Sequence, residues 1–225
     1  MNIRQWVEAG KPWNVILHGD CMDLMNHFND KEVPLCITDP PYFDGPQKSN
    51  YYKGTKQKTE VGQYKDLSKS WGLPDKKYFD ELFRISKNQI IWGINYFDIA
   101  LPGGRIVWVK GVEKSPFSMC DIAYQSFYNR IDMFKYLWSG FWQEEMKNKD
   151  IRIHPTQKPV ALYRWLLQNY AKPGDKIIDT HSGSGSLACA CHLEKFDFLA
   201  IEKDEDYFKS SVERLDTLRS QGTLF

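Results

Sequence analysis

Short apolar runs alternate with longer amphipathic stretches along this chain. Each run is rich in aliphatic or aromatic residues and ends at a polar or turn-forming residue, which predicts a buried β-strand. These runs lie at 15–20, 33–37, 89–92, 105–110, 176–179 and 196–201. Helical spacing predicts helices at 21–28, 74–85, 93–97, after 154–159, at 186–193 and at 203–218. The alternation predicts an α/β protein with strand-helix-strand crossovers.

The run at 33–37 continues into an unusual sequence, Thr38-Asp39-Pro40-Pro41-Tyr42-Phe43. A proline has no N–H to donate to a sheet and its φ is fixed, so the two prolines end the strand and hold their neighbours rigidly. Open α/β sheets bind ligands beyond the carboxyl ends of their strands. We therefore expect Asp39 and Tyr42 to line a pocket that suits a flat, nitrogen-bearing ring. The alternative is that these residues form only a turn.

A second candidate site follows the run at 176–179. The sequence Asp179-Thr180-His181-Ser182-Gly183-Ser184-Gly185 leads directly into a predicted helix. Glycines in such a loop allow the backbone to approach a ligand closely. A single Gly-x-Gly is weak evidence, but Glu202 ends the next predicted strand, where an acid typically binds ribose hydroxyls. The loop and Glu202 together predict a nucleotide-like cofactor.

Asp39-Pro40-Pro41-Tyr42 resembles the catalytic motif of amino-methyltransferases that modify adenine N6, and less often cytosine N4, in DNA. The loop at 179–185 resembles the S-adenosylmethionine loop of the same family, and His-Pro-Thr-Gln-Lys-Pro at 154–159 resembles the element that precedes it. The motif order, catalytic motif first and glycine loop last, is similar to that of the β class. The resemblance implies a Rossmann-like, doubly wound, mostly parallel sheet with helices on both faces, a permuted motif order and a small inserted target-recognition region.

The resemblance also implies roles for individual residues. The catalytic residues that it implies are Asp39, Pro40, Pro41 and Tyr42. Its S-adenosylmethionine-binding residues are Asp20, Cys21, Asp39, Thr156, Lys158, Asp179, His181, Ser182, Gly183, Ser184, Gly185, Glu202 and Lys203. Its substrate-binding residues are Tyr42, Phe43, Lys48, Lys53 and Lys110. Asp39 and the Pro40 carbonyl would accept the two hydrogens of the adenine amine, while Tyr42 stacks on a base that has left the duplex.

Several of these residues have a simpler interpretation. Asp20 and Thr156 are placed to cap the helices that follow them, and Lys110 is placed as a charge at the end of a strand. His181 stands where the family usually has phenylalanine. A neutral imidazole there either stacks or hydrogen-bonds near the cofactor, or has a purely structural role.

Binding of DNA by this chain requires a local concentration of positive charge, because the net charge is only +1. The segment 47–77 has eight lysines and three acidic residues, a net charge of +5, with tyrosines between the lysines. Such a segment can hold phosphates and stack bases, although many lysine-rich segments are solvated surface loops.

We expect one methyltransferase domain at 1–225, with a mobile basic loop at 44–73 and a target-recognition insertion at 115–153.

Composition limits the remaining possibilities. No apolar stretch approaches the length of a membrane span and the first residues lack the apolar core of a signal peptide, so we expect a cytoplasmic protein. The resemblance implies a bacterial, phage or mobile-element origin. The five cysteines suit reduced thiols, and no Cys/His cluster predicts a metal. Double-stranded DNA is the expected partner. The resemblance also allows a homodimer and a cognate restriction endonuclease.

Other functions fit parts of the sequence. A dinucleotide-dependent oxidoreductase would use the glycine loop and Glu202, but it leaves 39–42 and 154–159 unexplained. A catalytically dead nucleic-acid-binding relative would retain both motifs without activity. A cytosine-N4 methyltransferase would use the same motifs, although that activity more often has serine at the position of Asp39. RNA or protein is a less favoured substrate.

Overall fold

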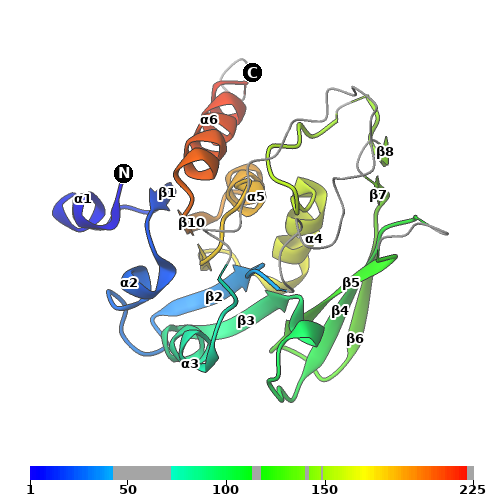
Figure 1. Cartoon of the computed structure of the whole chain (residues 1–225), viewed down its shortest axis with the longest axis horizontal. Coiled ribbons are helices and arrows are strands. Elements are labelled where there is room, and N and C mark those ends of the chain that lie inside the picture. Colours follow the sequence, from blue (N-terminus) through cyan, green and yellow to red (C-terminus); the bar gives the residue numbers. More distant parts are fainter. Residues whose placement is uncertain (43–71, 113–117, 140–141, 148, 222–225) are drawn as a thin grey trace.

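The sheet of this protein has strands that, with one exception, run in the same direction (Figure 1). The computed structural model describes residues 1–42, 72–112, 118–139, 142–147 and 149–221. Within them, eight strands pair in the order β1-β10-β9-β2-β3-β5-β4-β6. They are β1 (Val15–His18), β2 (Val33–Thr38), β3 (Ser86–Trp92), β4 (Gly104–Val109), β5 (Cys120–Gln125), β6 (Ile131–Lys135), β9 (Lys176–Asp179) and β10 (Asp197–Glu202). Only β5 is antiparallel to its neighbours, so the predicted mostly parallel α/β sheet is confirmed.

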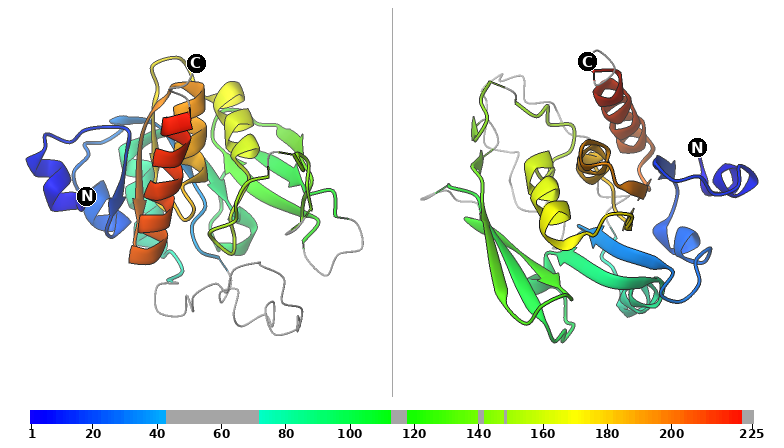
Figure 2. Two further views of the ribbon diagram at one scale, coloured as in Figure 1. Left: turned by 90° about the horizontal axis from the view of Figure 1, so that it is seen from above. Right: turned by 180° about the vertical axis from the view of Figure 1, so that it is seen from behind.

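Helices cover both faces of the sheet, as Figure 2 shows from two further directions. One core contains residues of α4 (Val160–Tyr170), α5 (Ser186–Glu194) and α6 (Glu205–Gln221). The other contains residues of α1 (Ile3–Glu8), α2 (Cys21–Met25) and α3 (Lys76–Ile85). Successive strand residues enter opposite cores: Ile177 belongs to the first and Ile178 to the second. Burial on both faces explains why these strands read as continuous apolar runs.

Local sequence explains α3, which reaches toward the carboxyl end of β2. The side chain of Asp75 accepts a hydrogen bond from the Tyr78 N–H at 2.9 Å, so it caps the start of the helix. Tyr78, Leu82 and Ile85 are buried at helical spacing. The helix is therefore fixed by its first turn and by one apolar face.

The parallel strands bring the predicted motifs to one edge of the sheet. β2 pairs with β9, β9 with β10, and β10 with β1, all in parallel. The carboxyl ends of these strands therefore meet, and Asp39, Asp179 and Glu202 lie at or directly after them. The functional site is expected at this edge.

The structure differs from the sequence expectations in two regions. Within residues 1–12, for which no element was predicted, Ile3–Glu8 form α1, where Trp6 is buried and its indole N–H donates to the Pro12 carbonyl at 2.8 Å. In 115–153, β5 and β6 join the main sheet, while β7 (Trp138–Ser139) and β8 (Trp142–Gln143) form a separate pair. Side chains of β6 alternate only between exposed and partly buried, so this strand has no clear apolar pattern.

Almost all of the predicted basic loop at 44–73 lies outside the described residues. In the described part of the chain, no helix has the length and apolar character needed to cross a bilayer.

Candidate active site

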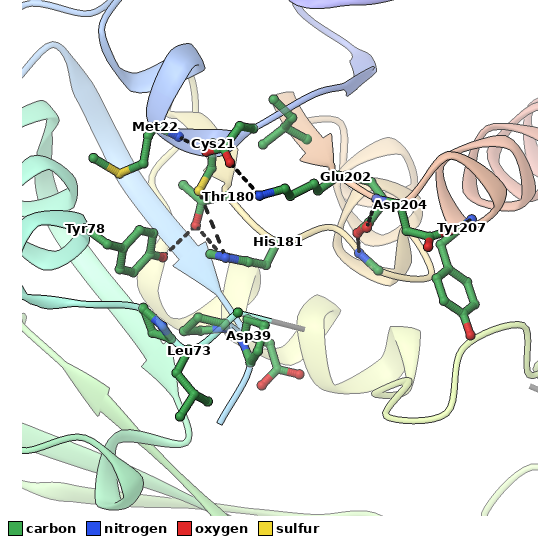
Figure 3. Close-up of a pocket in the computed structure, with 18 of the residues that line it drawn as sticks. Cys21, Met22, Asp39, Leu73, Tyr78, Thr180, His181, Glu202, Asp204 and Tyr207 are labelled. Carbon is green, nitrogen blue, oxygen red and sulfur yellow. Dashed lines mark hydrogen bonds and ion pairs between the residues drawn. The ribbon is translucent and has the colours of Figure 1, made fainter. Parts of the chain in front are cut away.

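A cavity of about 300 Å³ opens at the carboxyl ends of β1, β2, β9 and β10 (Figure 3). Its walls include Asp20, Asp39, Gly183 and Glu202, which come from segments far apart in the sequence. The Asp39-Pro40-Pro41-Tyr42 motif and the glycine loop therefore face one cavity, as their resemblance implies.

Asp39 lies on the wall of this cavity and is held by a buried lysine. Its Oδ2 accepts a hydrogen bond from Nζ of Lys158 at 2.6 Å. Its Oδ1 is buried and has no hydrogen-bond partner among the described residues. Burial raises the pKa of Asp39, and the ammonium of Lys158 opposes this rise. Asp39 therefore has one carboxylate oxygen fixed and one still able to accept a hydrogen bond.

The glycine loop is tied to Glu202. Gly183 has a φ of +51°, and its N–H donates to Oε2 of Glu202 at 2.8 Å. Oε1 of the same carboxylate accepts from the N–H of Asp204 at 2.8 Å. Burial raises the pKa of Glu202 to about 7, although these backbone donors lower it. The carboxylate thus fixes the loop and faces the cavity at the same time.

Asp20 both caps a helix and lines the cavity. Its Oδ1 accepts from the N–H of Met22 at 2.9 Å, and its Oδ2 accepts from Nζ of Lys203 at 2.8 Å. The capping role and the cofactor role considered for Asp20 are thus compatible.

His181 belongs to a polar cluster on the cavity wall. Its Nδ1 lies 3.1 Å from Oγ1 of Thr180, and that hydroxyl also lies 2.7 Å from the Tyr78 hydroxyl and 2.8 Å from Oγ1 of Thr38. The imidazole meets the Tyr78 ring edge to face, with centroids 5.2 Å apart. Burial lowers the pKa of His181 to about 4, so the ring is neutral at pH 7. The imidazole therefore combines the packing of an aromatic ring with a hydrogen bond.

Comparison with known proteins places this chain in a family. The N6_N4_Mtase family model, described as DNA methylase, matches residues 47–213. The chain belongs to this DNA methylase family. The resemblance inferred from the motifs is therefore confirmed.

Two kinds of relative agree with this family. This chain is 24% identical over 255 residues to the Type II methyltransferase M2.MboI of Moraxella bovis. The match covers 95% of this chain and 92% of that protein. The fold of this DNA methylase is similar to the M1.HpyAVI–SAM complex, with a TM-score of 0.56 and 21% identity over 88% of this chain and 98% of the other. It is also similar to PvuII DNA methyltransferase (cytosine-N4-specific), with a TM-score of 0.58 and 13% identity over 92% and 91% of the two chains. These structures support the predicted Rossmann-like fold.

The cavity of the DNA methylase gathers many, but not all, of the predicted site residues. The predicted residues that line it are Asp20, Cys21, Asp39, Pro40, Pro41, Tyr42, Thr156, His181, Gly183, Glu202 and Lys203. The predicted residues that are described but do not line it are Lys110, Lys158, Asp179, Ser182, Ser184 and Gly185. Phe43, Lys48 and Lys53 lie outside the described residues.

The predicted residues away from the cavity wall have observable local contacts. Asp179 is buried, its Oδ1 accepts the His181 N–H at 3.0 Å, and burial raises its pKa to about 8. The Ser184 hydroxyl lies 3.0 Å from that of Ser186, and Gly185 begins α5 with a φ of +71°. These contacts shape the loop. Direct cofactor binding by these residues stays a prediction.

Several residues of the cavity wall were not predicted from the sequence. Tyr78 enters from α3, and His154 lies against Gly183, its ring atoms 3.7 Å from where a Cβ of that glycine would be. His154 belongs to the quoted 154–159 motif, which was the available signal. Tyr78 had none, because its spacing marks it only as a core residue of a helix.

Proposed function

We propose that this DNA methylase transfers a methyl group from S-adenosylmethionine to N6 of an adenine that has been flipped out of double-stranded DNA. The observation that carries the proposal is that Asp39 and Gly183 line the same cavity. The family supports it, and the similar M1.HpyAVI structure is a SAM complex. The expected homodimer and restriction endonuclease partner stay predictions.

The cavity residues fit S-adenosylmethionine. Each carboxylate oxygen of Glu202 accepts one backbone N–H and retains acceptor capacity for a ribose hydroxyl. Gly183 presents backbone without a side chain, and Asp20, Thr156 and His181 add polar groups to the same wall. When bound, S-adenosylmethionine supplies an electrophilic methyl group on a sulfonium. The donor and acceptor set of the cavity therefore suits its nucleoside part.

Asp39 is placed to prepare the target amine. The nitrogen lone pair of adenine N6 is delocalised into the ring, so it is a weak nucleophile. In our proposal, Oδ1 of Asp39 and the Pro40 carbonyl accept the two amine hydrogens, which localises the lone pair and stabilises the positive charge that develops. Tyr42 stacks on the flipped base. No covalent intermediate with the protein is needed.

The proposal is tested by incubating the purified chain with DNA and methyl-labelled S-adenosylmethionine, and by sequencing modified bases in plasmid DNA from an expressing host. We expect N6-methyladenine at a defined sequence. Asp39→Ala should reduce transfer by about 100-fold or more, with cofactor affinity largely unchanged. Asp30→Ala, which removes an exposed acid paired with Arg84, is the control.

Three outcomes contradict parts of this proposal. N4-methylcytosine in the plasmid would support the cytosine-N4 alternative, since a cytosine amine can make the same contacts. Cofactor and DNA binding without any transfer would identify a catalytically dead relative. Undiminished transfer by Asp39→Ala would reject the role of Asp39.

A further inference from the structure

Four side chains of alternating charge form a continuous chain that begins at Asp39. Oδ2 of Asp39 lies 2.6 Å from Nζ of Lys158, and the same Nζ lies 3.8 Å from Oδ2 of Asp121. Oδ1 of Asp121 in turn lies 2.7 Å from Nζ of Lys110. Asp121 does not line the cavity, and no motif in the sequence includes it.

Burial makes this arrangement electrostatically demanding. The side chain of Lys158 is 2% exposed, while those of Asp121 and Lys110 are 14% and 18% exposed. A buried ammonium is costly unless carboxylates compensate its charge. Burial alone would lower the pKa of Lys158, but Asp39 and Asp121 outweigh it and raise that pKa above its ordinary value. Lys158 is thus a cation shared between two carboxylates.

The sheet fixes the position of Asp121. On β5, Asp121 is paired with Trp108 of β4, and β5 is also bonded to β3 on its other side. The chain just before β5 is held as well, because the Lys110 N–H donates to the Met119 carbonyl at 2.9 Å. Asp121 itself pairs only with β4, but on the β3 side the carbonyl of its neighbour Ile122 accepts the Gly93 N–H at 2.9 Å. The backbone beside Asp121 is therefore held on both sides, which suits a residue that must hold another in place.

The shared cation affects the charge available on Asp39. If Asp39 were the sole partner of Lys158, the ammonium would neutralise much of the negative charge of Asp39. The carboxylate would then be a weaker acceptor for the hydrogen bond from the target amine. A second carboxylate at 3.8 Å offsets part of that field, and Lys110 compensates the second carboxylate at the more exposed end of the chain. Oδ1 of Asp39, which has no hydrogen-bond partner in the described part of the protein, then remains a strong acceptor.

We propose that Asp121 is a positioning residue for methyl transfer: it shares the ammonium of Lys158 and so preserves the acceptor strength of Asp39. This inference rests on the proposed function. Lys158, predicted from the sequence to hold the cofactor carboxylate, acts in this arrangement on Asp39.

The test compares the full chain with Asp121→Asn, using labelled S-adenosylmethionine and plasmid DNA that carries the sequence found to be modified. The isosteric change should lower kcat by about tenfold or more. The cofactor Kd should not change. The acid limb of the kcat–pH profile should move to lower pH, because Asp121 no longer raises the pKa of Asp39. Among the described residues, the other charged or titratable groups near Asp39 are Lys158, Lys110, Tyr163, Asp179 and the Tyr42 hydroxyl, and they are the same in both proteins.

A double-mutant cycle separates this role from a structural one. If Asp121 acts through Lys158, then Asp121→Asn should have no further effect on kcat in a Lys158→Met background. The matched control is Asp132→Asn on β6, which removes the charge of an acid paired with Arg130, keeps an oxygen that can accept from the Tyr170 hydroxyl, and should leave kcat unchanged.

The outcomes distinguish the inference from the function on which it rests. No transfer by the unaltered chain overturns the proposed function and this inference with it. Transfer by the unaltered chain, with an equal kcat for Asp121→Asn, overturns the inference alone. Additive losses in the cycle, or a loss without movement of the acid limb, also overturn it.

Discussion

A Cβ atom on Gly93 would lie 2.2 Å from Cδ1 of Tyr42, so the tyrosine ring packs directly against the backbone at the end of β3. Gly93 has a φ of +70°, which residues with a Cβ rarely adopt. The Tyr42 ring also stacks on Tyr96, with centroids 4.8 Å apart and planes at 6°. The absence of a side chain at Gly93 thus permits the position of the ring that we expect to stack on the target base.

Gly93→Ala should displace Tyr42 and slow methyl transfer. A shift of about 1 Å in a group that positions substrate can reduce the rate by about 100-fold, so we expect a loss between about 10-fold and 100-fold. Cofactor affinity should change little, because Glu202 and the glycine loop are unaltered. A labelled-methyl assay measures the rate of transfer, and titration calorimetry measures the cofactor affinity.

The control for this prediction is Gly174→Ala. Gly174 also has a positive φ, +87°, but a Cβ there would have no atom within 4 Å. This variant should show only the backbone cost, about 1 kcal/mol of stability, with normal transfer. Equal activities for the two alanine variants would mean that the contact between Gly93 and Tyr42 does not matter for catalysis.

Glu202 should make cofactor binding depend on pH near neutrality. Burial raises its pKa to about 7, so the free protein loses this proton as the pH rises through that value. Ribose hydroxyls donate best to the ionised carboxylate, and affinity for S-adenosylmethionine should therefore increase from pH 5.5 to pH 8. Below this pKa, the affinity for the cofactor can increase by up to about tenfold per pH unit if binding releases one proton. Calorimetry at several pH values measures it.

The stability of the free protein should respond to Glu202 in the opposite direction. Because its folded-state pKa is above the ordinary value, Glu202 favours unfolding as the pH rises from about 4.5 to about 7. Glu202→Gln should weaken cofactor binding. It should also make both the cofactor affinity and the free energy of unfolding depend less on pH. Glu205→Gln, an exposed change beside Lys209, should do neither. A pH-dependent Kd that persists in Glu202→Gln would assign the titration to another group, such as the buried Asp179.

The strands that build the site were predictable because their residues are buried on both faces. Continuous apolar runs such as 33–37 and 176–179 report this directly, and Asp39 and Glu202 were selected because they follow such runs. β6 escaped prediction because Ile131 and Met133 are exposed and alternate with polar or partly buried residues. β1, at the other end of the sheet order, was predicted because Ile16 and Leu17 are buried.

Contacts between distant side chains were not predictable. Lys158 was selected from a motif, but its pairing with Asp39 depends on how α4 lies against β2. The cluster of Thr38, Tyr78, Thr180 and His181 likewise joins three segments that only the folded chain brings together. Sequence spacing identifies which residues end a strand. It does not identify which of those residues will share a hydrogen bond.

His181→Phe should make the protein less sensitive to acid. Burial lowers the pKa of His181 to about 4. The unfolded chain therefore binds a proton on this residue before the folded protein does, and folding stability falls between about pH 6.5 and pH 4. The difference in pKa corresponds to roughly 3 kcal/mol at the acid end of that range. Urea unfolding of both proteins at pH 7 and pH 4 measures the change.

The variant should remain folded and active at pH 7, because a phenyl ring can retain the edge-to-face contact with Tyr78 and Thr180 keeps its hydroxyl partners Thr38 and Tyr78. Loss of the hydrogen bond to Nδ1 should cost only about 1 kcal/mol. His154, whose pKa is lowered by burial to about 3, is present in both proteins and destabilises them equally in acid. His192→Phe, at a partly exposed position of α5, is the control. If His181→Phe loses as much stability as the unaltered protein between pH 7 and pH 4, the buried imidazole is not the source of acid sensitivity, and the cluster must tolerate a charged ring.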